Sequence, residues 1–277
     1  MALLSVNKVI KKINAMEKDE VKSLPAFNHI YAYNPSDKDK ILLRMNNVVK
    51  RFRNGFKSYK YVLKDFNFTL YKKNHVALIG ANGAGKTTLL EIICGVQKAN
   101  GGEIGFGFPF VYTPFEKVSI QFQANRYPSG LSVNDIIIFL KSVRKGVFIK
   151  QNELNEMLEA FNLKSLLYKE ANSLSGGQKQ RLNVMISLLS NPKLLLLDEL
   201  TTGLDVYSQK QVLGYLKKYL DKHETTLICV SHNVLEIEEL ADRIVLLRQG
   251  QIVVDADKYK LLEHKQNLQE FVAQYLV

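Results

Sequence analysis

The sequence contains no hydrophobic run of the roughly 18 residues that a membrane-spanning helix needs. Its first residues, MALLSVNKVIKK, also lack the long apolar centre and the cleavage site of a secretory signal. Both absences argue against a secreted protein and against one that inserts into a bilayer by itself. With 277 residues and 46% hydrophobic composition, the chain can still bury the core of one large domain, with or without a subdomain.

Cysteine is scarce, and acidic residues are outnumbered by basic ones. Cys94 and Cys229 both lie in apolar segments far apart in the sequence, which predicts buried thiols in a reducing compartment. No zinc-binding spacing of Cys and His occurs. The net charge of +11 favours an anionic partner, which could be nucleotide phosphates, nucleic acid or an anionic membrane surface. Charge alone does not choose among these three.

An apolar run that ends in two acids indicates a buried strand with polar chemistry at its end. Leu194 to Leu197 are four consecutive leucines, typical of a central parallel strand that is buried on both faces. Ligands of open α/β sheets bind at the carboxyl ends of the strands. The acids that follow, Asp198 and Glu199, are therefore candidates for a metal ligand and a general base. A plain core strand running into a polar loop would show the same pattern.

A phosphate-binding loop follows the short apolar strand His75 to Ile79. The sequence there matches G-x-x-x-x-G-K-T and continues into the helical pattern LLEIICGV. Glycines let backbone N–H groups wrap phosphate oxygens, and a helix N-terminus points about half a positive charge at them. Lys86 would neutralise the terminal phosphates, and the Thr87 hydroxyl would coordinate Mg²⁺. The predicted nucleotide-binding residues are Gly80, Asn82, Gly83, Ala84, Gly85, Lys86, Thr87 and Thr88.

Two stretches before this loop have more than one interpretation. Residues 1–40 form an N-terminal extension in which apolar residues from Leu3 to Ile13 recur at helical spacing among lysines. We expect an amphipathic basic helix that packs on the domain surface or contacts a membrane surface or partner helix. Ile41 to Leu70 alternates apolar and polar residues, which predicts antiparallel strands. Its aromatic residues fit a strand face, but one could stack on a nucleobase.

A second glycine-containing helix start lies at LSGGQ. Helical periodicity between Leu131 and Leu174 predicts a small helical insert that ends there. Ser175 and Gln178 have the spacing of a capping box, which any helix start would explain. The capping box does not explain Gly176 and Gly177, because a glycine in the first helical turn costs roughly 1 kcal/mol relative to alanine. Two glycines there would let bare backbone approach a second anion.

Together these motifs resemble the nucleotide-binding subunit of ABC transporters. The resemblance rests on GANGAGKT, LSGGQ, LLLLDE, Gly203-Leu204-Asp205 and a later His, in the family's order from about Ile41 to Asp255. It implies an α/β P-loop NTPase fold, with a RecA-like core, an antiparallel β subdomain and an α-helical signature subdomain. Residues 41–255 would form this ATPase domain, with the helical subdomain at about 124–174. Residues 256–277 would add an amphipathic C-terminal helix, after a β-hairpin that turns at Gln249-Gly250.

The resemblance also implies a role for each motif. Such cassettes pair head to tail, so that each ATP lies between the phosphate loop of one protomer and the signature of the other. Ser175, Gly176, Gly177 and Gln178 would then meet the γ-phosphate in trans, and Asp205 would lie in the loop that contacts the opposite protomer.

Catalytic roles follow in the same way. Glu199 would polarise the attacking water, Asp198 would hold Mg²⁺ through its shell, and Gln123 would link the metal to the helical subdomain. His232 would contact the γ-phosphate. Phe52 fits the position that stacks on adenine, with Tyr59 as the alternative. Leu200 stands where the family usually has proline, which leaves the local loop geometry open.

We therefore expect an ATPase that uses ATP and Mg²⁺ at the cytoplasmic face of the cell membrane. Its partners would be a second ATPase subunit and separate transmembrane permease subunits, with no nucleic acid. The amino-acid sequences LSGGQKQRLN and DELTTGLDV most resemble those of exporter cassettes, and energy-coupling-type importers are the second choice. A soluble cassette acting on nucleic acid or the ribosome is the second functional class, which the +11 charge supports. A non-hydrolysing scaffold is the third, although every catalytic position that the family has is filled here.

Overall fold

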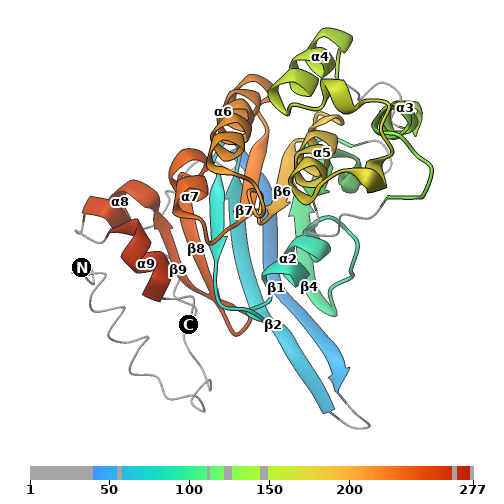
Figure 1. Ribbon diagram of the computed structural model, residues 1–277. Coiled ribbons are helices and arrows are strands. Elements are labelled where there is room, and N and C mark those ends of the chain that lie inside the picture. Colours follow the sequence, from blue (N-terminus) through green and yellow to red (C-terminus); the bar gives the residue numbers. More distant parts are fainter. Residues whose placement is uncertain are drawn as a thin grey trace. The chain divides into compact units, whose positions relative to one another are not determined.

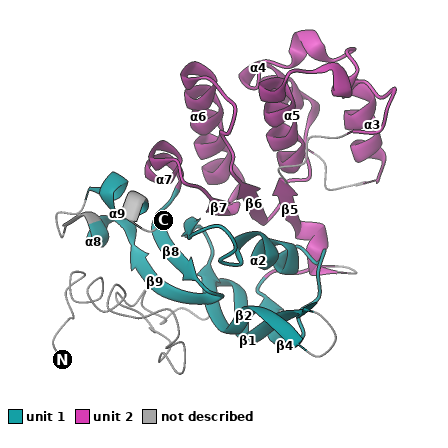
Figure 2. Ribbon diagram, turned by 60° about the horizontal axis from the view of Figure 1, so that its bottom comes forward, with its two compact units in different colours: residues 1–107, 241–277 teal, residues 108–240 magenta. Residues whose placement is uncertain are grey.

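The structure is a computed structural model that describes residues 40–54, 58–110, 113–121, 127–143, 149–263 and 267–274. The chain divides into two compact units, residues 1–107 with 241–277 and residues 108–240 (Figure 2). Residues 1–39 of the predicted N-terminal extension lie outside the described residues, as does Gln123. Within the described ranges, no helix is long and apolar enough to cross a membrane.

The first unit contains the antiparallel strands that the alternating pattern predicts. Strands β1 (Ile41–Asn54) and β2 (Ser58–Tyr71) pair antiparallel, and β4 (Gly101–Phe106) joins the other edge of β1 (Figure 1). Their apolar side chains are buried along the half of the hairpin that contains Leu43 and Leu70, whereas the half that ends at Asn54 and Ser58 is exposed.

A second group of strands in this unit positions the phosphate loop. Strand β3 (Val76–Ile79) is buried throughout and pairs in parallel with β8 (Arg243–Arg248). It leads through the loop into α2 (Lys86–Ile93). The predicted hairpin is present, because β8 turns at Gln249 and Gly250 into antiparallel β9 (Gln251–Asp257). A buried two-pronged ion pair between Arg243 and Asp255 holds the hairpin together.

The described part of the C-terminal segment is helical, as the sequence predicts. Helix α8 spans Lys258–Glu263 and α9 spans Leu268–Gln274. The Asp257 carboxylate accepts hydrogen bonds from the backbone N–H groups of Tyr259 and Lys260, and it thereby caps α8 directly after β9. Leu261, Leu268 and Val272, which the pattern places on one apolar side, are buried.

The second unit is a parallel α/β arrangement. Strands β5 (Val118–Gln121), β6 (Leu194–Asp198) and β7 (Thr226–Val230) pair in that order. Every residue of β6 and β7 is buried, as expected for apolar runs with helices on the sheet faces. Helix α5 (Gly176–Leu188) packs on β5 and β6. The chain between them forms α3 (Val133–Val143) and α4 (Gln151–Ala160), within the predicted helical insert.

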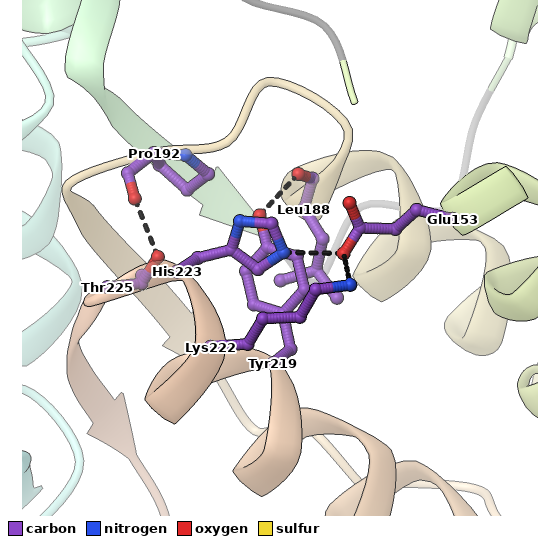
Figure 3. A network of polar contacts seen from close by, with 7 residues as sticks. All are labelled: Glu153, Leu188, Pro192, Tyr219, Lys222, His223 and Thr225. Atoms are coloured by element: carbon purple, nitrogen blue, oxygen red, sulfur yellow. Dashed lines mark hydrogen bonds and ion pairs between the residues drawn. The ribbon is translucent and has the colours of Figure 1, made fainter. Parts of the chain in front are cut away.

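A buried polar network joins α4 to the end of α6 (Val206–His223) (Figure 3). The Glu153 carboxylate of α4 lies 2.5 Å from His223 Nε2 and 3.1 Å from Lys222 Nζ. Burial alone would raise the pKa of Glu153, but the hydrogen bonds from His223 and Lys222 outweigh it, and the pKa is lowered. Tyr219, which stacks on His223, donates to the carbonyl of Leu188 in α5. This network therefore ties the helical insert to two helices of the parallel layer.

Candidate functional site

The phosphate loop is folded back on itself in the first unit. Helix α2 begins at Lys86, and its first turn carries no acidic residue, so its N–H groups face no competing carboxylate there. The Lys86 ammonium is buried and donates to the carbonyls of Gly80, at 2.5 Å, and Ala81, at 3.0 Å. A cation and a helix N-terminus are thus held within one loop. This arrangement suits an anion with several negative oxygens.

Packing, as well as phosphate access, requires some of the loop glycines. A Cβ at Gly80 would lie 2.2 Å from the Leu247 carbonyl oxygen, and one at Gly85 would lie 3.0 Å from the Val62 carbonyl oxygen. Gly83 is different, because a Cβ there would meet nothing within 4 Å. Its φ of +79° still favours glycine. Gly80 and Gly85 therefore let the loop pack against its own sheets, which the motif alone did not reveal.

The exposed half of the β1–β2 hairpin presents three aromatic rings. Phe52, Tyr59 and Tyr61 are 41%, 52% and 45% exposed. The Lys50 ammonium lies 4.9 Å from the centroid of the Phe52 ring, and the Arg51 guanidinium lies 4.3 Å from that of Tyr59. Arg51 also donates to the Tyr61 hydroxyl. The rings of Tyr59 and Tyr61 therefore share one cation, and Phe52 has another.

Register separates Phe52 from the two tyrosines. Phe52 pairs with Lys60 across the hairpin, whereas Arg51 pairs with Tyr61 and Arg53 pairs with Tyr59. Paired residues share a face of the sheet, and successive residues alternate between faces. Phe52 and Tyr59 therefore point to opposite sides of the hairpin.

The acidic pair lies at the end of β6 in the second unit. Asp198 is the last, buried residue of the strand, and it pairs with Val230 of β7. Glu199 leaves the strand in a left-handed backbone conformation, with φ of +53°, and its N–H donates to the Val230 carbonyl at 2.9 Å. The Thr202 hydroxyl is 3.5 Å from the Glu199 carboxylate, which is half-buried. Glu199 is thus the first group beyond the strand that water can reach.

The loop that carries His232 is bonded to the loop after Glu199. Glu236 of α7 (Val234–Leu240) accepts the Thr201 N–H at 2.7 Å and also its hydroxyl, and Asn233 donates to the same hydroxyl at 3.1 Å. His232 itself is half-buried at the end of β7. Sequence reasoning missed Thr201, Asn233 and Glu236, whose proximity depends on the pairing of β6 with β7.

The signature sequence forms the expected helix start. Ser175 Oγ accepts the Gln178 N–H at 3.3 Å, and Gln178 Oε1 accepts the Ser175 N–H at 3.0 Å, so the capping box is present. Gly176 has open space around it. A Cβ at Gly177 would lie 3.2 Å from the Gly203 carbonyl oxygen. Gly177 therefore also lets α5 approach the loop that leads to Asp205.

Asp205 caps α6. Its carboxylate accepts the Ser208 N–H at 2.9 Å and the Ser208 hydroxyl at 2.7 Å, and these bonds lower its pKa. Arg181 of α5 donates to the same hydroxyl at 3.2 Å. The loop before α6 is thereby tied to the signature helix. The phosphate loop and Phe52 thus belong to the first unit, whereas Asp198, Glu199, the signature, Asp205 and His232 belong to the second.

Comparison with known proteins decides the family. A protein-family model described as ABC transporter matches residues 63–202, which contain the phosphate loop, the signature and the acidic pair. The chain belongs to the ABC transporter family. It is an ATP-binding cassette of the P-loop ATPase class, with the α/β fold that the motifs imply.

Individual ABC proteins align with more of the chain than the family model does. The chain is 33% identical to "Spermidine/putrescine import ATP-binding protein PotA" of Spiroplasma citri, over 84% of this chain and 67% of the relative. It is 32% identical to "Nickel import system ATP-binding protein NikE" of Staphylococcus aureus, over 73% of this chain and 86% of the relative. The PotA protein of Mycoplasma mycoides is 35% identical, and the chain spans only 61% of its length.

Solved structures of ABC cassettes have the same fold. One, titled as the ATP-binding subunit of an ABC transporter, aligns with a TM-score of 0.70 and 21% identity over 84% of this chain and 99% of the other. Another is a dimeric cassette in a post-hydrolysis state bound to ADP and Pi, with a TM-score of 0.67 and 24% identity over 78% and 98%. At these identities the likeness establishes the fold alone.

Proposed function

We propose that this chain binds and hydrolyses ATP to power an ABC importer through separate membrane subunits, at the cytoplasmic face of the membrane. The observation that carries the proposal is the placement of the motif residues, with a lysine and helix start in one unit and a strand-end acid pair in the other. Import rests on the relatives, whose names describe polyamine and nickel import. These names favour the importer alternative over the exporter that the motif sequences suggest.

In this proposal the phosphate loop binds the triphosphate. The backbone N–H groups between Gly80 and Thr88 surround it, and Lys86 exchanges its two carbonyl contacts for phosphate oxygens. Phe52 stacks on the adenine, the role that the family resemblance implies for it, while Tyr59 points to the opposite side of the hairpin. The exposed face of its ring is available for this contact.

The residues present fit a magnesium ion. Mg²⁺ prefers oxygen ligands and is usually held by one or two protein groups together with substrate phosphates. Thr87 at the start of α2 and Asp198 at the end of β6 offer a hydroxyl and a carboxylate. No group of three or more acidic, His or Cys side chains that could hold a metal ion lies among the described residues. When bound, Mg²⁺ neutralises charge on the phosphates. Gln123, the third predicted ligand, lies outside the described residues.

Hydrolysis is assigned to Glu199. Its carboxylate is half-buried at the strand end and can accept a proton from a water, while its backbone is held by β7. His232 contacts the γ-phosphate in this proposal. Its loop is joined to the loop after Glu199 through Thr201 and Glu236, so the two groups are held by one network.

The proposal includes a head-to-tail dimer in which the signature meets the partner's nucleotide. Ser175, Gly176, Gly177 and Gln178 form the start of α5, whose first turn contains no acid, and open space surrounds Gly176. Val206 and Tyr207, directly after Asp205, are 65% and 71% exposed and would lie in the same interface.

A permease contact is proposed for α3. Ile138, Phe139 and Val143 are 56%, 62% and 64% exposed on this helix, and Phe139 and Val143 lie one turn apart on the same side. An exposed apolar helix side is a common protein-docking surface. A transmembrane subunit is the partner that the family relationship indicates.

Two experiments test the proposal. Glu199→Gln with Mg²⁺ and ATP should elute as a dimer in size-exclusion chromatography, and addition of Lys86→Ala should return it to monomer. A Glu199→Gln protein that stays monomeric at saturating ATP would contradict the dimer mechanism.

Co-purification from membranes should recover a permease subunit. Recovery of RNA in its place would favour the soluble nucleic-acid alternative, to which the +11 charge lends support.

Direction of transport needs reconstitution with that permease. In vesicles that expose the cassette outside, an importer moves substrate out of the lumen when ATP is added, and an exporter loads the lumen. ATP-driven loading would overturn the importer assignment and leave the ATPase assignment intact.

A further inference from the structure

The backbone at Glu199 adopts a conformation that a residue with a Cβ disfavours. Its φ of +53° lies in the left-handed region, where Glu gains nothing from a local side-chain bond as Asn or Asp does. Such a conformation persists only when the surrounding structure over-determines it, and it is concentrated at functional sites. The N–H of Glu199 donates to the Val230 carbonyl, which fixes one side of its peptide backbone. The carbonyl of Glu199 needs a separate partner.

The side chain of Gln180 holds it. Gln180 lies in the second turn of α5, is only 5% exposed, and directs its amide at the turn after β6. Its Nε2 lies 3.0 Å from the Glu199 carbonyl oxygen and 2.9 Å from the Leu200 carbonyl oxygen. An amide NH₂ has two hydrogens, so both carbonyls can be satisfied at once. Leu200, which stands where proline is usual in the family, is itself fully buried.

We propose that Gln180 is a positioning residue for ATP hydrolysis: it fixes the left-handed turn at Glu199 and thereby aims the carboxylate at the water. Gln180 contacts no reacting atom in this scheme. It lies on the same helix as the signature residues Gly176 and Gly177, two residues beyond Gln178. A shift of the start of α5 is therefore passed to the Glu199 backbone of the same protomer.

This inference rests on the proposed function, because it requires that Glu199 act in hydrolysis and that α5 meet nucleotide. It adds a direct link between the two. Through Gln180, the nucleotide that touches one protomer's signature would affect the base of that same protomer, which serves the other nucleotide. The two sites of the dimer would then be coupled without a contact across the interface at Glu199 itself.

The competing explanation is that Gln180 only satisfies two buried carbonyls. Gln180→Met distinguishes this explanation from positioning, because methionine has a similar length but no hydrogen-bond donor. Positioning predicts a kcat at least 10-fold lower, equivalent to 1.36 kcal/mol in the barrier. It also predicts an ATP dissociation constant within twofold of wild type. In the Glu199→Gln background the ATP-dependent dimer should persist, and Gln180→Met should cause no further loss of residual hydrolysis.

Gln151→Met is the matched control. Gln151 is exposed on α4, and its amide donates to the Asn155 side chain one turn later at 3.4 Å, so the kcat of this variant should stay within twofold of wild type. If Gln180→Met does not fold, Gln180→Asn retains the amide but is too short to reach both carbonyls, and it should still lower kcat selectively.

The inference is overturned if both Gln180 variants hydrolyse ATP within twofold of wild type, or if they lose ATP binding and the dimer along with kcat. Either result leaves the proposed function untouched as long as Glu199→Gln alone forms the ATP-dependent dimer. If Glu199→Gln alone does not form that dimer, the proposed function fails instead.

Discussion

Gly250 offers a sharp test of how the phosphate loop is supported. It lies in the turn between β8 and β9 with φ of +80°. Its N–H donates to the Ala84 carbonyl of the phosphate loop at 3.1 Å, and its own carbonyl accepts the Lys64 N–H of β2 at 3.2 Å. The turn thus joins β2 to the nucleotide-binding loop within one unit. We expect Gly250→Ala to weaken both folding and ATP binding.

The magnitude follows from two contributions. A residue with a Cβ in the left-handed region costs about 1–2 kcal/mol. A Cβ at Gly250 would also lie 2.2 Å from the Val62 carbonyl oxygen, a distance that no real contact tolerates, so the turn must shift. That shift weakens two backbone hydrogen bonds, each worth about 0.5–1.5 kcal/mol. The free energy of unfolding should therefore fall by about 2–5 kcal/mol.

Urea unfolding and ATP titration together check this prediction. Gly105→Ala is the matched control, because Gly105 lies in β4 of the same unit with nothing within 4 Å of a Cβ and no positive φ. Its effect should stay within about 0.5 kcal/mol. The ATP dissociation constant of Gly250→Ala, measured in the absence of urea, should rise at least threefold. Lower stability with unchanged ATP affinity would refute the claim that the turn positions the loop.

Three further predictions concern other parts of the molecule. Glu153→Gln should lower the free energy of unfolding by about 1.5–3 kcal/mol at pH 7, because charged hydrogen bonds are lost. Folding lowers the pKa of Glu153, so the carboxylate contributes to stability above its usual pKa of 4.5, and this contribution is lost as the pH falls through the folded pKa. Urea unfolding should therefore give a smaller difference between Glu153→Gln and wild type at pH 4 than at pH 7. Phe52→Ala should raise the ATP dissociation constant by roughly 5- to 160-fold, from a stacking energy of about 1–3 kcal/mol, while Tyr59→Ala changes it less than twofold in a fluorescence competition assay. Phe139→Asp should abolish permease co-purification without changing the thermal midpoint or basal ATPase rate, and unchanged recovery would exclude α3 as the contact.

The features that sequence predicted well are local ones. The phosphate loop needs a strand, three glycines and a helix start in succession, and all lie within Val76–Ile93. The capping box at Ser175 and Gln178 needs only three residues of separation. The leucine run before Asp198 predicts a doubly buried strand because nothing but a covered sheet accommodates it. In each case the pattern and the physical cause lie within one element.

The features that sequence missed depend on elements far apart in the chain. Nothing near Gly250 indicates that its N–H would bond the phosphate loop, since Ala84 lies more than 160 residues earlier. The direction of transport is a separate matter, because the motifs concern nucleotide binding and do not indicate which way cargo moves.

The catalytic end of β6 illustrates why motif matching stops short of mechanism. Burial raises the pKa of Glu236; hydrogen bonds from Ser231 and Thr201 oppose this, and the charge of Glu199 adds to it. Its Oε2 has no hydrogen-bond partner among the described residues. A buried carboxyl with a raised pKa therefore sits between the loop after Glu199 and the loop after His232. In the proposed mechanism Glu199 and His232 act from two loops that these shared groups hold together, so we expect a change in one loop to alter the geometry of the other. The rate of hydrolysis would then depend on this network as well as on the motif residues.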